Sequence, residues 1–356
     1  MYMLLVYTST MSFRSWLSVI TLVLIAGILY LTRDELIQAW KLLSEVNLYI
    51  LATIIPVAAI SYLAAGEMIF SYLREKNHIK HVKPWTLARM SLELNFVNHI
   101  LPSGGVSGIS YMNWRLSKYG VPLGKATVAQ LVRYVAGFAA LASLLFISVI
   151  VVTIDGNINR WIILMSSAIV TVMIVATMGL IYLMSSPARL RRFSGFVTHA
   201  VNRVVRKVSM GRKDELLDKL IVNAYFQDMH DDYLLLKHDS RGLIRPYLWG
   251  LLFTIAEITV FFVTFLSLGF VVNPAAILIA YGVASFAGFI VVTPGGAGAY
   301  EAIMVLILSA SGLPSDTAIA GVVLARVIIL LTTIGLGYIF YQRALIKYGK
   351  RRTSDI

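Results

Sequence analysis

Three ionisable residues lie within long apolar stretches that could cross a bilayer. Arg133 lies in ATVAQLVRYVAG, Arg326 lies in AIAGVVLARVII, and Glu257 lies in a third apolar stretch. An ionisable group at bilayer depth costs about 2.5–3.5 kcal/mol even on the mild insertion scale. A guanidinium presents several N–H donors in a planar fork, which suits phosphate groups. The functional interpretation is a polar cavity in which the two arginines receive an anionic head group.

Further candidates cluster around two shorter apolar segments, each of which ends in a Pro/Gly-rich turn. The candidate translocation residues on the first segment and its turn are Arg89, Glu93, Asn95, Asn98, His99, Pro102, Gly104, Gly105 and Gly108, and those around the second turn are Pro294, Gly295, Gly296, Gly298 and Glu301. Glycines let the backbone turn sharply and bring N–H groups close to a ligand. Helix N-termini at such turns would add positive dipole ends.

A structural role for the same residues is the alternative. Arg89 and Glu93 are spaced i, i+4 and could pair on one helix face. Arg326 with Glu301, and Arg133 with Glu257 or Glu93, could be ion pairs that hold broken helices together, and such pairs can also serve function.

The histidines carry weaker signals. His99 beside Asn98 is typical of a hydrogen-bonded packing residue rather than a proton carrier, and His78 and His81 are interpreted as solvated. The stretch 228–239 (DMHDDYLLLKHD) lacks metal-site spacing and is interpreted as a polar helix face. The sequence contains no dinucleotide, P-loop or hydrolase motif. We therefore expect no metal, no cofactor and no catalytic residue.

Composition indicates which elements must position these residues. The chain has 356 residues, of which 58% are hydrophobic and 14% charged. Soluble domains contain roughly 25% charged residues, so the composition predicts an all-α polytopic membrane protein. The sequence has no cysteine, which excludes disulfides, thiolate zinc sites, cysteine nucleophiles and palmitoylation.

Hydropathy predicts about six transmembrane helices. The six stretches are Ser15–Thr32, Val46–Ser71, Ala126–Ile154, Trp161–Met184, Leu248–Phe270 and Thr317–Tyr341. The first lacks a small-residue cleavage site and is interpreted as a retained anchor rather than a signal peptide. Two shorter stretches, Trp85–Leu101 and Ala275–Thr293, lead into the turns 101–108 and 292–299.

The distribution of basic residues predicts the orientation. They are concentrated in 72–83, 115–125, the first half of 187–245 and the C-terminus. The positive-inside rule therefore predicts a multi-pass protein of the cell (cytoplasmic) membrane with both termini in the cytoplasm. Because 72–83 and 115–125 fall on the same side, the chain between them must form a re-entrant hairpin. The second short stretch must enter and return from the outside, and turns at membrane depth indicate a site.

A repeated pattern accompanies the two turns. It consists of a Gly-Gly pair, a Gly-x-Pro and an intramembrane arginine, at an offset of about 191–193 residues. The predicted orientation makes the two halves, approximately 13–154 and 160–345, an inverted repeat, which is typical of transporters. The alternative is coincidence, since Gly-Gly and Gly-x-Pro are common in loops.

The segment 187–208 alternates arginine with apolar residues at helical spacing. This pattern predicts an amphipathic helix, within the basic cytoplasmic loop 187–245, that lies on the anionic inner leaflet. A nucleic-acid surface is the remote alternative, and no fold motif supports it.

The motifs HILPSGGVSG (99–108) and VVTPGGAGAYE (291–301) resemble the flippase-like family, also called the lysylphosphatidylglycerol synthase transmembrane region. The resemblance covers nearly the whole chain and implies a single domain, 1–356, that moves a lipid or a lipid-linked glycan between leaflets. The second motif, with Glu301 and Arg326, is the more specific. In the first, Val106 and Ser107 occupy positions where many relatives carry an acidic residue and an arginine, and the next arginine is Arg115.

We expect a flippase or transporter of an anionic phospholipid or a polyprenyl-phosphate-linked glycolipid, rather than an enzyme. Transport would be facilitated or ion-coupled, with Glu257, Glu301 or Glu93 as candidate proton carriers. Aminoacyl-lipid-synthesising relatives carry a soluble domain after the membrane part, and this chain ends eleven residues beyond Leu345, so lysyl transfer is not expected.

The expected partners are a lipid with an anionic head group, anionic inner-leaflet lipids, and enzymes of lipid or glycan synthesis, but no nucleic acid. Two other functions stay open. One is a membrane-embedded transferase acting on a lipid-linked sugar or head group, and the other is a non-transporting partner of a synthesis complex. The oligomeric state is not indicated by the sequence.

Overall fold

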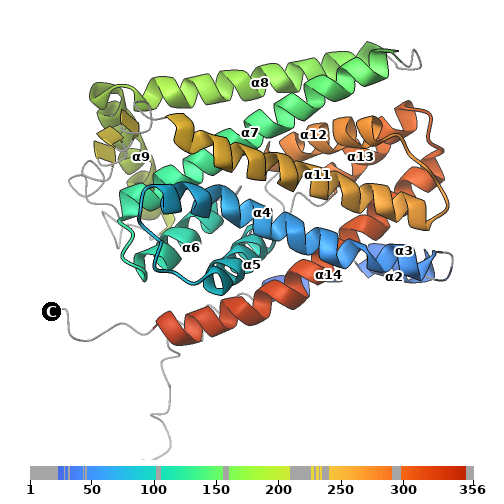
Figure 1. Cartoon of the computed structure of the whole chain (residues 1–356), viewed down its shortest axis with the longest axis horizontal. Coiled ribbons are helices and arrows are strands. Elements are labelled where there is room, and N and C mark those ends of the chain that lie inside the picture. The colour runs from blue at the N-terminus through green and yellow to red at the C-terminus, as the bar shows by residue number, and fades with distance from the viewer. Residues whose placement is uncertain are drawn as a thin grey trace, which may run out of the picture.

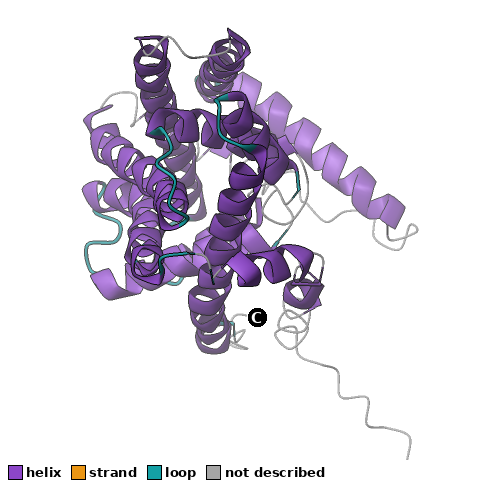
Figure 2. Cartoon of the chain, turned by 90° about the vertical axis from the view of Figure 1, so that its right-hand side faces the viewer, coloured by secondary structure: helices purple, strands orange, loops and turns teal. Residues whose placement is uncertain are grey.

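The computed structural model is helical wherever it has regular structure. It describes residues 23–27, 29–30, 33–42, 44, 46–101, 106–154, 160–208, 226–227, 230–231, 233–234, 240–290 and 298–349. Its elements are α2 (Arg33–Leu42), α3 (Leu48–Ala52), α4 (Ile54–Glu75), α5 (Pro84–Ile100), α6 (Val106–Ser117), α7 (Leu123–Ile154), α8 (Arg160–Met184), α9 (Pro187–Val208), η1 (Ser240–Leu243), α11 (Ile244–Ser267), α12 (Pro274–Ile290), α13 (Ala299–Ala310) and α14 (Ser315–Tyr348). The residues so described contain no strand, so the all-α prediction is confirmed (Figure 2).

Four of these helical segments are long and apolar enough to cross a membrane. They are Leu48–Glu75, Leu123–Val151, Arg241–Ser267 and Ser315–Tyr348. The segments Val170–Met184 and Pro187–Phe196 meet at a bend of 104°, and they give a fifth candidate span if the bent pair is counted as one. Of the predicted first span, Ser15–Thr32, the structure describes only residues 23–27 and 29–30. The structure therefore supports a multi-pass membrane protein with four to five spans in its described part, and the predicted total of six stays a prediction.

Two helical hairpins occur where the sequence predicts re-entrant segments. Helices α5 and α12 have 17 residues each, and the helices that follow them, α6 and α13, have 12 residues each. Each of these helices is shorter than the roughly 20 residues that a span requires. In Figure 1 the α5/α6 hairpin lies toward the end of the bundle that holds α9, and the α12/α13 hairpin lies toward the end that holds α2 and α3. This is the arrangement that an inverted repeat predicts, although the repeat itself stays a prediction.

Small residues let the long helices approach the hairpins closely. Helix α14 packs on α5, and α4 packs on both α5 and α11. At Gly337 of α14, an added Cβ would lie 2.4 Å from Cβ of Phe96 and 3.0 Å from the carbonyl oxygen of Leu92. At Gly66 of α4, an added Cβ would lie 1.8 Å from the Ser91 hydroxyl. Close packing through glycine is a common way for helices to associate in membranes.

Candidate functional site

Glu301 links the start of α13 to the arginine inside α14. Its Oε2 accepts a hydrogen bond from the backbone N–H of Gly298 at 2.7 Å, and its Oε1 accepts one from Nε of Arg326 at 2.6 Å. Gly298 has a φ of +87°, a conformation that glycine adopts without strain. The Arg326 guanidinium also lies 4.4 Å from the centre of the Tyr300 ring. The structure thus contains the Arg326–Glu301 pair that the sequence suggests, with side chains 16% and 12% exposed.

A polar cluster near this pair adds residues from two further helices, α4 and α11, and from α14 itself. The Ser61 hydroxyl of α4 donates a hydrogen bond to the Glu257 carboxylate of α11. The neighbouring Tyr62 hydroxyl hydrogen-bonds to Thr333 of α14. Arg326 lies within electrostatic range of both Glu257 and Tyr62. Two carboxylates and one guanidinium are therefore gathered where α4, α11, α13 and α14 meet.

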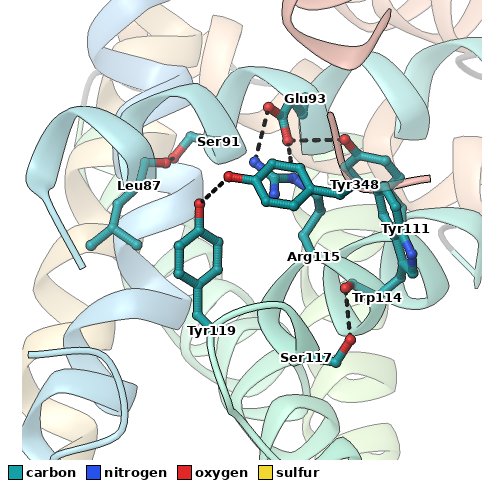
Figure 3. A network of polar contacts seen from close by, with 9 residues as sticks. All are labelled: Leu87, Ser91, Glu93, Tyr111, Trp114, Arg115, Ser117, Tyr119 and Tyr348. Carbon is teal, nitrogen blue, oxygen red and sulfur yellow. Dashed lines mark hydrogen bonds and ion pairs between the residues drawn. The ribbon is translucent and has the colours of Figure 1, made fainter. Parts of the chain in front are cut away.

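Glu93 pairs with Arg115 rather than with Arg89, the partner that helix spacing made possible (Figure 3). Nε of Arg115 lies 2.6 Å from Oε2 of Glu93, Nη2 lies 3.3 Å from Oε1, and the Tyr111 hydroxyl donates to Oε2 at 2.9 Å. Both side chains of the pair are 3% exposed. Arg115 comes from α6, which folds back against α5. The Arg89 guanidinium lies instead 5.0 Å from the Trp85 ring.

Arg133 forms neither of the two ion pairs considered for it. Glu93 is bound to Arg115, and Glu257 accepts from Ser61. The Arg133 guanidinium lies 4.6 Å from the Tyr134 ring, and its buried Nε has no hydrogen-bond partner among the described residues. The resemblance between Arg133 and Arg326 in sequence is therefore not matched by equivalent ion pairing.

Two polar residues near the tip of the first hairpin make local contacts. Nδ1 of His99 hydrogen-bonds to the Asn95 carbonyl oxygen at 2.8 Å, which agrees with a packing role for this histidine. Asn98 faces Gly108, where an added Cβ would lie 1.9 Å from Oδ1 of the asparagine. That Oδ1 atom is buried without a hydrogen-bond partner in the part of the chain the structure describes. Six candidate turn residues lie outside the described residues, namely Pro102, Gly104, Gly105, Pro294, Gly295 and Gly296.

An amide network between α6 and α7 was not foreseen. Nε2 of Gln130 donates to Oδ1 of Asn113 at 2.7 Å, and Nδ2 of Asn113 donates to the Thr127 hydroxyl at 2.7 Å. Thr127 and Gln130 are spaced i, i+3 inside an apolar span, so their shared face could have been noticed. Spacing along one helix does not indicate the roles of Arg115 and Tyr111 on α6, since both hydrogen-bond to Glu93 on α5.

The stretch 228–239 lies largely outside the described residues. One of its described members, His230, is buried, and its Nδ1 hydrogen-bonds to the Met184 carbonyl oxygen at 2.7 Å. No group of three or more His, Asp or Glu residues that could hold a metal ion occurs among the residues the structure describes.

Comparisons with known proteins bear on the whole helical region. The family described as the lysylphosphatidylglycerol synthase TM region matches residues 18–337. A UPF0104 membrane protein of Methanothermobacter thermautotrophicus is 25% identical over 254 residues, which cover 70% of this chain and 71% of the relative. The chain is thus similar to membrane proteins over nearly all of its predicted spans.

Proposed function

Because the chain belongs to the lysylphosphatidylglycerol synthase transmembrane-region family, we propose that it moves a lipid with an anionic head group between the two leaflets of a cell membrane. The proposed cargo is an anionic phospholipid or a polyprenyl-phosphate-linked glycolipid. The observation that carries the proposal is the Arg326–Glu301 pair at the start of the short helix α13.

Arg326 is well placed to exchange one anion for another. Its guanidinium is held by the Glu301 carboxylate and the Tyr300 ring, and it is largely buried. Breaking a buried ion pair leaves an uncompensated charge, unless another anion replaces the lost partner. A head-group phosphate is such a replacement, since its oxygens can accept charge-assisted hydrogen bonds from the guanidinium in place of the carboxylate. The lipid tails would stay in the bilayer while the head group passes.

The carboxylates near Arg326 are the candidate coupling groups. When a head group displaces Glu301 from Arg326, the released carboxylate needs a proton or another cation. Glu257 lies within electrostatic range of Arg326 and is a second candidate proton carrier. We propose transport rather than catalysis, with the head group exchanged at Arg326 and no covalent change to the lipid.

The experiment is lipid translocation in proteoliposomes, measured with a fluorescent anionic lipid and a membrane-impermeant quencher. Arg326→Ala removes the proposed head-group contact, and we expect at least about a tenfold loss of initial rate, as for loss of one charge-assisted contact. Arg33→Ala removes an exposed arginine of α2 and serves as the control. Equal rates for wild type and Arg326→Ala would contradict the assignment.

A membrane-embedded transferase is the second candidate, and one observation bears on it. Glu93 lines a pocket, as a catalytic carboxylate would need to. Both of its oxygens, however, already accept hydrogen bonds from Arg115 and Tyr111. Mass analysis of lipids recovered from the same proteoliposomes separates the two functions, because a transferase yields a new lipid species and a transporter does not.

A further inference from the structure

A pocket of about 360 Å³ opens between α5, α6 and the last turns of α14. Six of its lining residues are basic: His81, Lys83, Arg89, Arg115, Arg343 and Lys347. The lining contains a single carboxylate, that of Glu93. Two of the helices that line it, α5 and α6, lie toward the end of the bundle that the charge distribution predicts to face the cytoplasm (Figure 1). It is built from residues other than Arg326 and Glu301, so it is a separate site.

The positive charge of this pocket is not balanced by the protein. Among the described residues, only one of the six basic side chains, Arg115, forms an ion pair, and its partner Glu93 is thereby engaged as well. Lys83, Arg89, Arg343 and Lys347 remain without a carboxylate within ion-pair distance in that part of the chain. Like charges gathered on one concave surface repel each other and raise the local concentration of anions. The lining therefore favours a ligand with more than one negative charge.

Buried donors show where such a ligand would be held. The Arg115 side chain is 3% exposed, and Nε and Nη2 are bound to Glu93. Its third nitrogen, Nη1, is buried with no hydrogen-bond partner among the described residues, and the same holds for Nε of Arg89. A buried donor left unpaired is unfavourable, and more so when it is charged. An acceptor supplied by a ligand would remove this cost.

The wall around Arg115 is fixed rather than loose. The Arg115 guanidinium lies 4.6 Å from the Tyr348 ring, and the Tyr348 and Tyr119 hydroxyls are 3.0 Å apart (Figure 3). These contacts join α6 to the end of α14 across the pocket. A preorganised arginine loses little freedom on binding, which favours a specific ligand over a diffuse ion cloud.

We propose that this pocket binds a phosphate group carrying two negative charges, as in a phosphomonoester or a diphosphate. A terminal phosphate offers several acceptor oxygens at once, so it can accept from Arg115, Arg89 and the lysines together. A carboxylate or a phosphodiester brings one charge and fewer acceptors. The phosphate belongs either to a lipid head group or to a soluble molecule, and the site does not depend on the transport proposed above.

The test uses the full chain in nanodiscs at fixed ionic strength. Arg343→Gln combined with Lys347→Gln removes two exposed cations from the pocket wall without touching the buried pair. Arg191→Gln combined with Arg192→Gln removes the same charge from the exposed face of α9 and is the matched control. We expect the pocket variant to weaken binding of inorganic phosphate and diphosphate at least about tenfold, and the control to leave it unchanged.

The source of the phosphate is separated by the lipid composition of the nanodiscs. Retention of phosphatidic acid over phosphatidylglycerol, lost in the pocket variant, supports a lipid phosphomonoester. Binding of soluble phosphate with no preference between these lipids supports a soluble ligand. Equal affinities for the wild type and the pocket variant, or no binding of any phosphate probe, would overturn the proposal. Arg326→Ala should leave phosphate affinity unchanged, so this test and the transport test can fail independently.

Discussion

The two most buried ion pairs among the described residues, Glu93–Arg115 and Glu301–Arg326, each join residues on different helices. Helix spacing alone suggested that Glu93 pairs with Arg89, but the buried partner is Arg115 on the returning arm of the hairpin. The Arg326–Glu301 pair was one of the ion pairs that the sequence suggested, and the structure contains it. Spacing of i, i+4 brings two residues together on the surface of one helix. A buried charge instead pairs with the oppositely charged group that helix packing places beside it, and this group can lie on another helix.

The Glu93–Arg115 pair should stabilise the first hairpin strongly. Glu93→Ala leaves the buried Arg115 guanidinium without its carboxylate, and we expect a loss of about 3–5 kcal/mol. Glu67→Ala disrupts the partly exposed pair with Arg74 on α4 and should cost about 1 kcal/mol or less. Unfolding in detergent, followed by circular dichroism, compares the two variants. Equal destabilisation by both would contradict a special role for the buried pair.

At the scale of elements, hydropathy and turn residues predicted the helices and hairpins well. The segments α5, α6, α12 and α13 all occur where short apolar stretches and Pro/Gly clusters indicated them. The basic pocket was missed, because Lys83 and Arg343 were considered only as orientation signals and Arg115 only as one of these and as the next arginine after the first motif. Charge counting along the chain cannot indicate that α5, α6 and the end of α14 converge, since that depends on how the helices cross.

The crossing of α14 over α5 depends on one glycine. An added methyl group at Gly337 would meet Cβ of Phe96 at 2.4 Å and the Leu92 carbonyl oxygen at 3.0 Å, so Gly337→Ala should cost about 1–3 kcal/mol. Gly335, two residues earlier in the same helix, has nothing within 4 Å of such a methyl group. Gly335→Ala should therefore be neutral or stabilising by up to about 1 kcal/mol. Thermal unfolding of the two variants in one detergent gives the comparison, and a destabilised Gly335→Ala with an unaffected Gly337→Ala would reverse the assignment.

For the whole molecule, the two hairpins lie toward opposite ends of the long axis (Figure 1). The basic segments gather at the α5/α6 end, which predicts that this end faces the cytoplasm. The chain belongs to a membrane family over residues 18–337, so the bundle is placed in a bilayer by an observation independent of hydropathy. The orientation predicted from charge can be tested directly by the accessibility of introduced thiols.

Because the sequence contains no cysteine, a single introduced cysteine is the one thiol that a maleimide can label. Ser117→Cys places a thiol at the end of α6, and Val271→Cys places one in the exposed loop before α12. A membrane-impermeant maleimide applied to intact cells should label Val271→Cys but label Ser117→Cys only after the membrane is opened. Labelling of both positions from the same side would contradict the predicted topology.

The central claim is that this bundle moves lipids with anionic head groups. The most direct measurement is the initial translocation rate of fluorescent phosphatidylglycerol and of fluorescent phosphatidylcholine in proteoliposomes that contain the wild-type chain. Because the head group must engage Arg326, we predict that the anionic lipid moves faster than in protein-free liposomes and faster than the zwitterionic lipid. Rates for phosphatidylglycerol equal to those of protein-free liposomes, or equal to those of phosphatidylcholine, would contradict the claim.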